Sequence, residues 1–188
     1  MKKIFTLAVV AIASAFAANA GNGYIGGSLG FEHKEVKGEA QTNQFTILPE
    51  LGYNFNDKWA IGTTIGYQYT HFNGADTDTH LFKFDPYARF TYFRTSNNLV
   101  QLFVDGGAGI GVGSVDYGDD DSHTMVTWNV GFRPGVAFNF TDSFSMFAHV
   151  GFLGYKGANN AAYNVGIERK GGIMFDTTDL TLGFYYNF

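Results

Sequence analysis

The charged side chains are the candidates for chemistry in this chain, because of their types and their spacing. Glu50, Asp85, Arg89, Asp105 and Arg133 each lie at alternate positions opposite a run of apolar residues. Buried charges must pair with opposite charges or become neutral. The spacing therefore predicts a hydrogen-bonded network centred on the two arginines, with the three carboxylates as partners. A plug that fills the interior is the favoured interpretation, and a gated polar path for ions is the alternative.

A second group of acidic residues suggests a cation site. Asp116, Asp119, Asp120 and Asp121 bring four carboxylates into six positions, and carboxylate oxygens are the ligands that Ca²⁺ prefers. Their spacing matches no EF-hand loop. We interpret the segment as a solvated loop and expect no metal site, with Ca²⁺ binding as the weaker alternative.

The histidines and glycines do not form a known catalytic or nucleotide-binding motif. A hydrolase would need a serine, a histidine and an orienting acid, but no serine is convincingly placed beside His149, and His123 lies next to Ser122 in a loop. The glycine run at 106–113 lacks the spacing of a dinucleotide-binding loop, and no helix follows it. We expect no enzymatic activity and no cofactor.

These residues lie on segments with strict alternation of apolar and polar positions, the pattern of β-strands. The predicted strands cover residues 23–37, 45–55, 59–69, 82–92, 100–110, 126–140, 144–152 and 179–188. A hairpin unit beginning at Pro49 recurs at Pro86 and Pro134, each time with a short turn, at 56–58, 94–98 and 141–143. Three hairpins with one strand left at each end give eight strands.

The apolar face of these strands decides how the sheet closes. It carries many aromatic side chains, Trp128 and Phe152 among them, and no charged residue in the second to seventh predicted strands. An eight-stranded barrel has an interior too narrow for so many rings. Turned outward into lipid, the same face needs no interior volume, and the missing charges are explained by the cost of placing them there. The sequence predicts an all-β fold, an eight-stranded antiparallel up-and-down transmembrane β-barrel.

Aromatic residues also gather near the short turns, as expected of a girdle at the membrane–water interface. The predicted periplasmic girdle consists of Tyr53, Phe55, Trp59, Phe90, Tyr92, Phe138, Phe140 and Phe144. The other connections, at about 37–44, 73–80, 114–123 and 156–172, are longer and polar. Since such barrels have short periplasmic turns and long extracellular loops, we expect both termini in the periplasm.

The beginning of the chain predicts export. Lys2 and Lys3 precede an apolar stretch, and Ala18-Asn19-Ala20 forms a small-residue cleavage site, which together indicate a signal peptide at 1–20 and a mature barrel domain at 21–188.

The chain contains no cysteine, so it has no disulfide framework. Its formal net charge of −5, without basic clusters, argues against nucleic acid as a partner.

The signal peptide, the repeated hairpins and the final strand resemble the small outer-membrane barrels of the OmpA/OmpX type. More narrowly, the chain resembles the outer-membrane β-barrel domain ("porin family") proteins common in Bacteroidetes. The resemblance covers the whole mature chain and implies that the barrel-assembly machinery reads a C-terminal signal. The residues matching that signal are Leu182, Phe184, Tyr186 and Phe188.

From this we expect a monomer in the cell outer membrane, in contact with lipids and lipopolysaccharide. We expect a plugged polar lumen and a structural or surface-interaction role, with a host or surface ligand bound through the loops. A narrow channel, or a lateral transporter for small solutes or apolar molecules, is the alternative function, and an envelope enzyme is the third.

Overall fold

A computed structural model describes residues 22–34, 41–73, 77–116, 122–165, 167, 169–174 and 181–188. The predicted signal peptide lies outside the described residues. The described chain forms ten strand segments and one short helix. They are β1 (Gly23–Lys34), β2 (Gln41–Asn54), β3 (Trp59–Asn73), β4 (Thr77–Arg94), β5 (Val100–Asp116), β6 (Ser122–Asn139), β7 (Phe144–His149), β8 (Phe152–Ala158), α2 (Asn160–Asn164), β9 (Lys170–Met174) and β10 (Thr181–Asn187).

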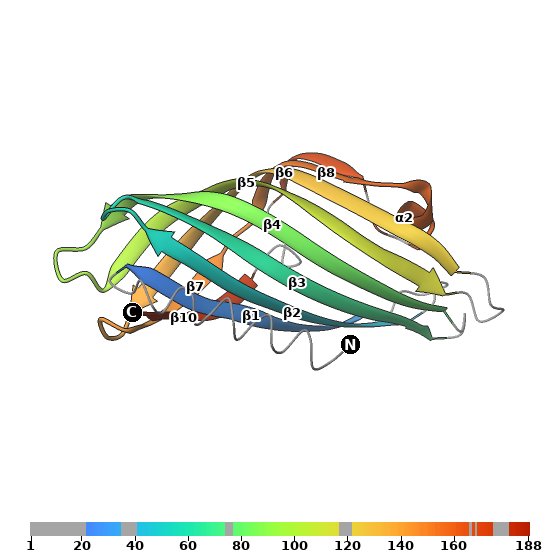
Figure 1. The fold of residues 1–188 in the computed structure, drawn as a ribbon, viewed down its shortest axis with the longest axis horizontal. Coiled ribbons are helices and arrows are strands. Elements are labelled where there is room, and N and C mark those ends of the chain that lie inside the picture. Colours follow the sequence, from blue (N-terminus) through green and yellow to red (C-terminus); the bar gives the residue numbers. More distant parts are fainter. Residues whose placement is uncertain are drawn as a thin grey trace.

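The strands close into a barrel (Figure 1). Consecutive strands from β1 to β6 pair antiparallel, β7 joins β6 to β10, and β10 pairs with β1. β7 and β8 together occupy the seventh position around the barrel, and β9 and β10 occupy the eighth. The prediction of a closed eight-stranded antiparallel barrel is confirmed.

The two ends of the barrel differ. One end carries the turns at residues 55–58, 95–99 and 140–143, together with the C-terminal Phe188, and we call it the turn end (Figure 1). The other carries α2 and the strand ends at Lys34, Gln41, Asn73, Thr77, Asp116 and Ser122, and we call it the loop end (Figure 1). Each interior residue can therefore be located by its distance from the turn end and from the loop end.

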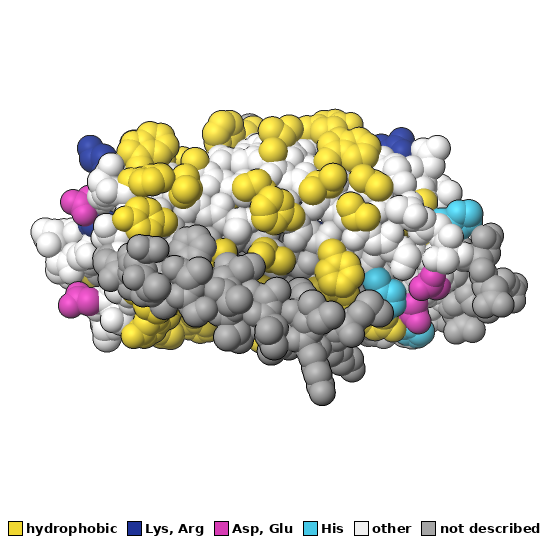
Figure 2. All heavy atoms as spheres, viewed as in Figure 1, with side chains coloured by type: hydrophobic (Ala, Val, Ile, Leu, Met, Phe, Trp, Pro, Cys, Tyr) yellow, Lys and Arg dark blue, Asp and Glu magenta, His cyan; other side chains and the backbone are white. Residues whose placement is uncertain are grey.

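The apolar face is the outside of the barrel, as predicted. In β4 the outward Phe84 is 50% exposed, whereas the inward Tyr87 is 5% exposed. Figure 2 shows hydrophobic side chains along the flank, with charged side chains gathered towards the two ends. Trp128 also lies outward. The aromatic rings on the outer face therefore take no interior volume, which resolves the crowding that an inward arrangement would cause.

The strands run further towards the loop end than predicted. β2 begins at Gln41, β3 ends at Asn73, β4 begins at Thr77 and β5 continues to Asp116. The predicted loops at 37–44, 73–80 and 114–123 are therefore wrong at residues 41–44, 73, 77–80, 114–116 and 122–123, and their other residues lie outside the described ranges. Alternation of apolar and polar residues ends where the strands leave lipid, but backbone pairing continues beyond that point.

The seventh strand reverses its faces at a break that the alternation did not predict. Gly151 between β7 and β8 has a φ of +77°, and the ladder to β6 passes from Gly135↔His149 to Phe132↔Leu153. Three residues on one strand thus face two on the other, which is a β-bulge. Phe152, predicted to face outward, is buried in the interior, because a shift of one residue exchanges the two faces.

The predicted loop at 156–172 contains a helix and parts of two strands. Asn159 caps α2 by accepting a hydrogen bond from the Ala162 backbone amide at 3.0 Å. Ala162 packs with Val115 and Met125, which face inward at the loop end. Among the described residues, no helix is long and apolar enough to cross a membrane.

Candidate functional site

The interior is crossed by a network centred on Arg89. Its Nε donates to Asp105 Oδ1 at 2.7 Å, and its Nη2 donates to Asp105 Oδ2 at 2.8 Å. The two residues are partners in the β4–β5 register, so the ladder itself brings their side chains together. Nη2 also contacts Glu50 Oε1 at 3.4 Å and the Tyr185 hydroxyl at 2.9 Å. Two-point pairing of this kind is the strongest and most directional ion pair available to a carboxylate.

Two tyrosines donate hydrogen bonds to Glu50, which is buried on β2, and a third tyrosine bonds to one of them. Tyr185 on β10 donates to Glu50 Oε1 at 2.7 Å, and Tyr87 on β4 donates to the same oxygen. The Tyr24 hydroxyl lies 2.6 Å from the Tyr87 hydroxyl. Side chains from β1, β2 and β10 are thereby joined to β4 inside the barrel, in addition to the backbone pairing of β1 with β2 and β10.

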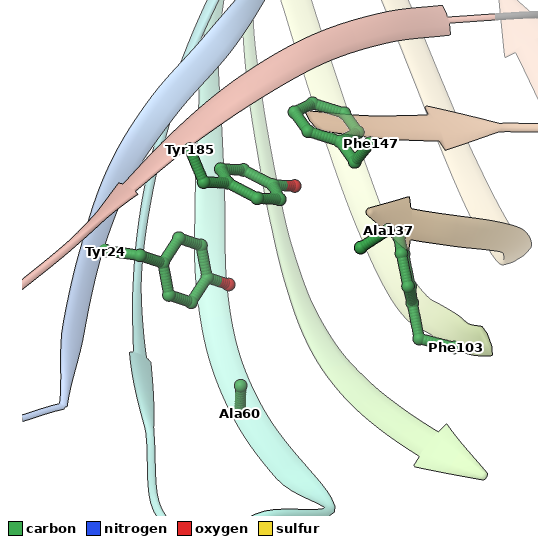
Figure 3. Packing of buried hydrophobic residues seen from close by; sticks show 6 residues of the cluster. All are labelled: Tyr24, Ala60, Phe103, Ala137, Phe147 and Tyr185. Atoms are coloured by element: carbon green, nitrogen blue, oxygen red, sulfur yellow. The ribbon is translucent and has the colours of Figure 1, made fainter. Parts of the chain in front are cut away.

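Aromatic rings pack around the Arg89 guanidinium. The Phe103 ring lies 4.0 Å from the Arg89 Cζ, and Phe147 stacks on Tyr185 with ring centroids 4.1 Å apart. Figure 3 shows Tyr24, Tyr185, Phe103 and Phe147 projecting from the surrounding strands into the interior. His149 Nε2 lies 2.7 Å from Asp105 Oδ2 and closes the network on the side of β7. Since a carboxylate only accepts hydrogen bonds, this contact requires a proton on Nε2.

Two glycines make room for the tyrosines. A Cβ at Gly52 would overlap the Tyr24 ring and hydroxyl, and a Cβ at Gly62 would overlap the Tyr87 hydroxyl. Both glycines are on strands adjacent to the tyrosine strands, in β2 and β3. The close approach of ring to backbone therefore requires glycine at these positions.

Two cavities lie on either side of this network, and we call it the plug for its position between them; it consists of Tyr24, Glu50, Tyr87, Arg89, Phe103, Asp105, Phe147, His149 and Tyr185. A cavity of about 290 Å³ lies on the turn-end side, lined in part by Arg89 and Tyr185. A larger cavity of about 600 Å³ lies on the loop-end side, lined in part by Asp85 and His149. We call the larger one the loop-end chamber.

The structure brings three of the five predicted network residues together, namely Glu50, Arg89 and Asp105. Asp85 lies apart from them and accepts a hydrogen bond from Asn129 Nδ2 at 2.6 Å. The prediction that Arg133 is a second centre is wrong for the described part of the chain, where its guanidinium has no carboxylate within reach. Arg133 stands opposite Asp105 in the β5–β6 register, but the Asp105 carboxylate bonds to Arg89 and His149 instead.

The tyrosines and His149 were not predicted as members of the network. Their signal was present in the alternation, because Tyr87, Tyr185 and His149 share the strand face that carries the charges. Aromatic residues on that face could have been recognised as partners of the buried carboxylates, since a tyrosine hydroxyl is a donor with an apolar body.

The aromatic residues predicted as a girdle lie at the turn end. Trp59 packs on Phe90 with centroids 4.8 Å apart, and Phe140 stacks near Phe144 at 6.1 Å. The exposed members are Phe55, Trp59, Tyr92, Phe140 and Phe144, and those partly covered are Tyr53, Phe90 and Phe138. The C-terminal residues predicted as an assembly signal all face outward: Leu182, Phe184, Tyr186 and Phe188.

Polar residues mark the loop-end edge of the outer apolar surface. On the outward face of β3 and β4, Asp78 Oδ1 accepts from Tyr69 at 2.9 Å and lies 2.8 Å from His71 Nδ1. The hydrogen bond from His71, with that from Tyr69, holds the pKa of the Asp78 carboxyl below its usual range. The contact with Asp78 raises the pKa of the Tyr69 hydroxyl. Because a carboxylate facing lipid would be costly, Asp78 and Tyr69 lie beyond the lipid-facing band.

Of the acidic residues predicted as a weak cation site, the structure describes only Asp116, which is the register partner of Asp78 at the loop end. Asp119, Asp120 and Asp121 lie outside the described residues. Within the described ranges, no group of three or more histidine, aspartate or glutamate side chains is arranged to hold a metal ion.

Comparison with known proteins gives a family and a fold. A family described as "Outer membrane protein beta-barrel domain" matches residues 4–188. Neisserial surface protein A is similar over 88% of this chain and 97% of its own, with 18% identity and a TM-score of 0.55. The N-terminal β-barrel domain of Pseudomonas aeruginosa OprF is similar over 89% of this chain and 98% of its own, with 18% identity and a TM-score of 0.52. A search of curated proteins found no match.

Proposed function

This chain belongs to the outer membrane protein beta-barrel domain family, and from that premise we propose that it is a plugged barrel with a structural and surface-interaction role. Its location in the outer membrane follows from the family. The plug between the two cavities is the observation that carries the proposal. A solute or ion crossing the lumen would have to separate Arg89 from Asp105.

The energy of that separation favours a closed lumen. Asp105 is 1% exposed and the Arg89 side chain is 9% exposed, so neither would find bulk water in place of its partner. Removing one partner of a buried ion pair costs about 3–5 kcal/mol. The stacked rings of Phe147 and Tyr185 fill the space beside the pair. We infer that the closed arrangement is the resting state of the lumen.

The outer surface has the height of a bilayer core. On β4 the outward apolar side chains run from Phe82 to Tyr92, which spans about 33 Å along a strand at about 3.3 Å per residue. A tilt of about 40° reduces this to about 25 Å along the membrane normal, the height of the apolar band of such barrels. Lipid acyl chains are therefore the proposed partners of this band.

We propose that the turn end faces the periplasm and the loop end faces outward. The aromatic girdle would then lie at the periplasmic headgroups, and the polar rim around Asp78 would meet lipopolysaccharide or a surface ligand. Leu182, Phe184, Tyr186 and Phe188, outward on the last strand, would be read by the barrel-assembly machinery. The barrel would act as a monomer.

Planar-bilayer conductance tests the plug. Wild-type protein should show no steady current or only small, irregular steps. An Arg89→Ala/Tyr185→Ala double variant removes the ion pair and the stacked ring, and should show larger and more frequent steps. Uniform ohmic steps from the wild type would overturn the plugged barrel and favour the narrow channel.

The buried histidine supports a non-enzymatic role. His149 is committed to Asp105 inside the plug, away from the lipid-facing surface where an acyl chain would lie. We therefore propose that the protein does not hydrolyse envelope lipids. Incubation with lipopolysaccharide followed by mass spectrometry should leave the acyl chains unchanged. Loss of an acyl chain with the wild type would contradict the proposal.

A further inference from the structure

The described lining of the loop-end chamber carries an excess of positive charge. Its basic side chains are Lys83, Arg133 and Lys156, and its acidic side chain is Asp85. His149 also reaches the chamber but is bonded to Asp105 in the plug. Asp85 in turn accepts a short hydrogen bond from Asn129. The residues described around this cavity are therefore short of negative charge.

Two of the cations have hydrogen-bond donors to spare. Lys83 Nζ donates to Gln68 Oε1 at 2.7 Å, a neutral partner, and an ammonium group has three donors. Arg133 has five N–H donors, and no described residue forms a hydrogen bond or ion pair with them. Both side chains are only partly exposed to solvent. Asp85 is the carboxylate of the described lining and acts electrostatically on Lys83, so the two cations together keep a surplus positive charge away from bulk water. An anion entering the chamber would therefore be stabilised.

The remaining lining suits a hydroxylated ligand of small-molecule size. Gln68 Nε2 donates to Gln44 Oε1 at 2.9 Å, and Thr64 and Thr127 also face the cavity. Amides and hydroxyls of this kind exchange hydrogen bonds with alcohol groups. The volume of about 600 Å³ falls within the usual range of small-molecule sites.

We propose that the loop-end chamber binds a small hydroxylated oxyanion, a sugar acid or a sugar phosphate, through Arg133 and Lys83. The guanidinium would take the carboxylate or phosphate in a two-point contact, and the ammonium would supply the second positive charge. The side-chain amides of Gln44, Gln68 and Asn129 would form hydrogen bonds with the hydroxyl groups of the ligand. This goes beyond the proposed structural role and does not depend on it, because Arg133 and Lys83 are not members of the plug.

Isothermal titration calorimetry on the full mature protein in detergent micelles tests the site. The probes are glucuronate for the carboxylate, glucose 6-phosphate for the phosphate ester and glucose for the neutral sugar. Binding of at least one anion and no heat from glucose are expected. Arg133→Gln and Lys83→Gln should each weaken binding about tenfold or more, which corresponds to about 1.4 kcal/mol.

Matched variants separate the chamber from charge elsewhere. Lys58→Gln removes an exposed lysine in a turn at the other end of the barrel and should leave the affinity unchanged. Arg133→Lys keeps the charge and should retain part of the affinity. Heat-dependent gel mobility verifies that each variant is folded. The proposal would be overturned if neither anion bound up to about 10 mM, or if Arg133→Gln and Lys83→Gln both bound the anion as tightly as the wild type. Either outcome counts whatever the conductance experiment shows.

Discussion

Arg89 and Asp105 stand directly opposite each other on β4 and β5 and are joined by two hydrogen bonds of 2.7 and 2.8 Å inside the barrel. The register of β4 and β5 thus brings Arg89 and Asp105 together, and their two-point pairing is a strong polar contact of the interior. Glu50, His149 and Tyr185 attach to this pair from three other strands. The pair is consequently a cross-brace between strands far apart in the sequence, and the proposed closure of the lumen depends on it.

Breaking this pair should destabilise the barrel strongly. Asp105→Asn leaves Arg89 buried with only one carboxylate, Glu50, in reach, and we expect a loss of about 3–5 kcal/mol in the free energy of unfolding. Urea titration in lipid vesicles, followed by tryptophan fluorescence, measures it. Arg94→Ala serves as the control, since the side-chain bonds of Arg94, among the residues that the structure describes, are to the exposed turn residue Asp57. A loss below about 1 kcal/mol in Asp105→Asn would show that the pair is not a brace.

One hydroxyl of the plug can be tested against its neighbour in sequence. Tyr185→Phe removes a donor to Glu50 and an acceptor for Arg89, and should cost about 1–3 kcal/mol. Tyr186→Phe makes the same chemical change on a side chain that is 52% exposed on the outer face. That control should stay within about 0.5 kcal/mol of the wild type. Equal effects in the same unfolding assay would contradict the role assigned to the inner hydroxyl.

The close approach of tyrosine to backbone gives another test. Gly52→Ala places a methyl group where the Tyr24 ring lies, and Gly62→Ala places one at the Tyr87 hydroxyl. Overpacking of this kind costs about 1–3 kcal/mol. At Gly30 a Cβ would meet its nearest neighbour, Thr46 Cβ, at 3.6 Å, so Gly30→Ala should be tolerated. The fraction of protein that folds into the heat-modifiable form compares the three variants, and similar yields would mean that the glycines are not required for the plug.

The alternation of apolar and polar residues was sufficient to predict the barrel. It determined which face meets lipid, because the outer face carries rings such as Phe84 and the inner face carries groups such as Arg89. It failed at Gly151, where one residue in the left-handed region turned Phe152 inward. The bulge changes the phase of the alternation, so that the outward positions pass from Val150 to Leu153 and Tyr155.

The candidate site was predicted only in part. The common parity and depth of Glu50, Arg89 and Asp105 indicated that they would meet. The same reasoning assigned Arg133 to the network, although the Asp105 carboxylate bonds to Arg89 and His149 instead. Which of two arginines obtains a shared carboxylate depends on side-chain reach across several strands. Sequence spacing does not contain that information.

The inside-out arrangement of the whole barrel is tested by an arginine placed on its outer face. Val130 on β6 points outward, is 55% exposed and lies well away from both ends of its strand. Val130→Arg should lower the free energy of unfolding in lipid vesicles by about 2–4 kcal/mol, because an arginine near the bilayer midplane cannot be hydrated. Phe140→Arg, at the turn end beside the headgroups, should cost only about 0–1 kcal/mol for its charge, with a further loss from the ring it replaces. The depth dependence is the decisive readout, and a Val130→Arg protein as stable as the wild type would mean that this face does not meet lipid.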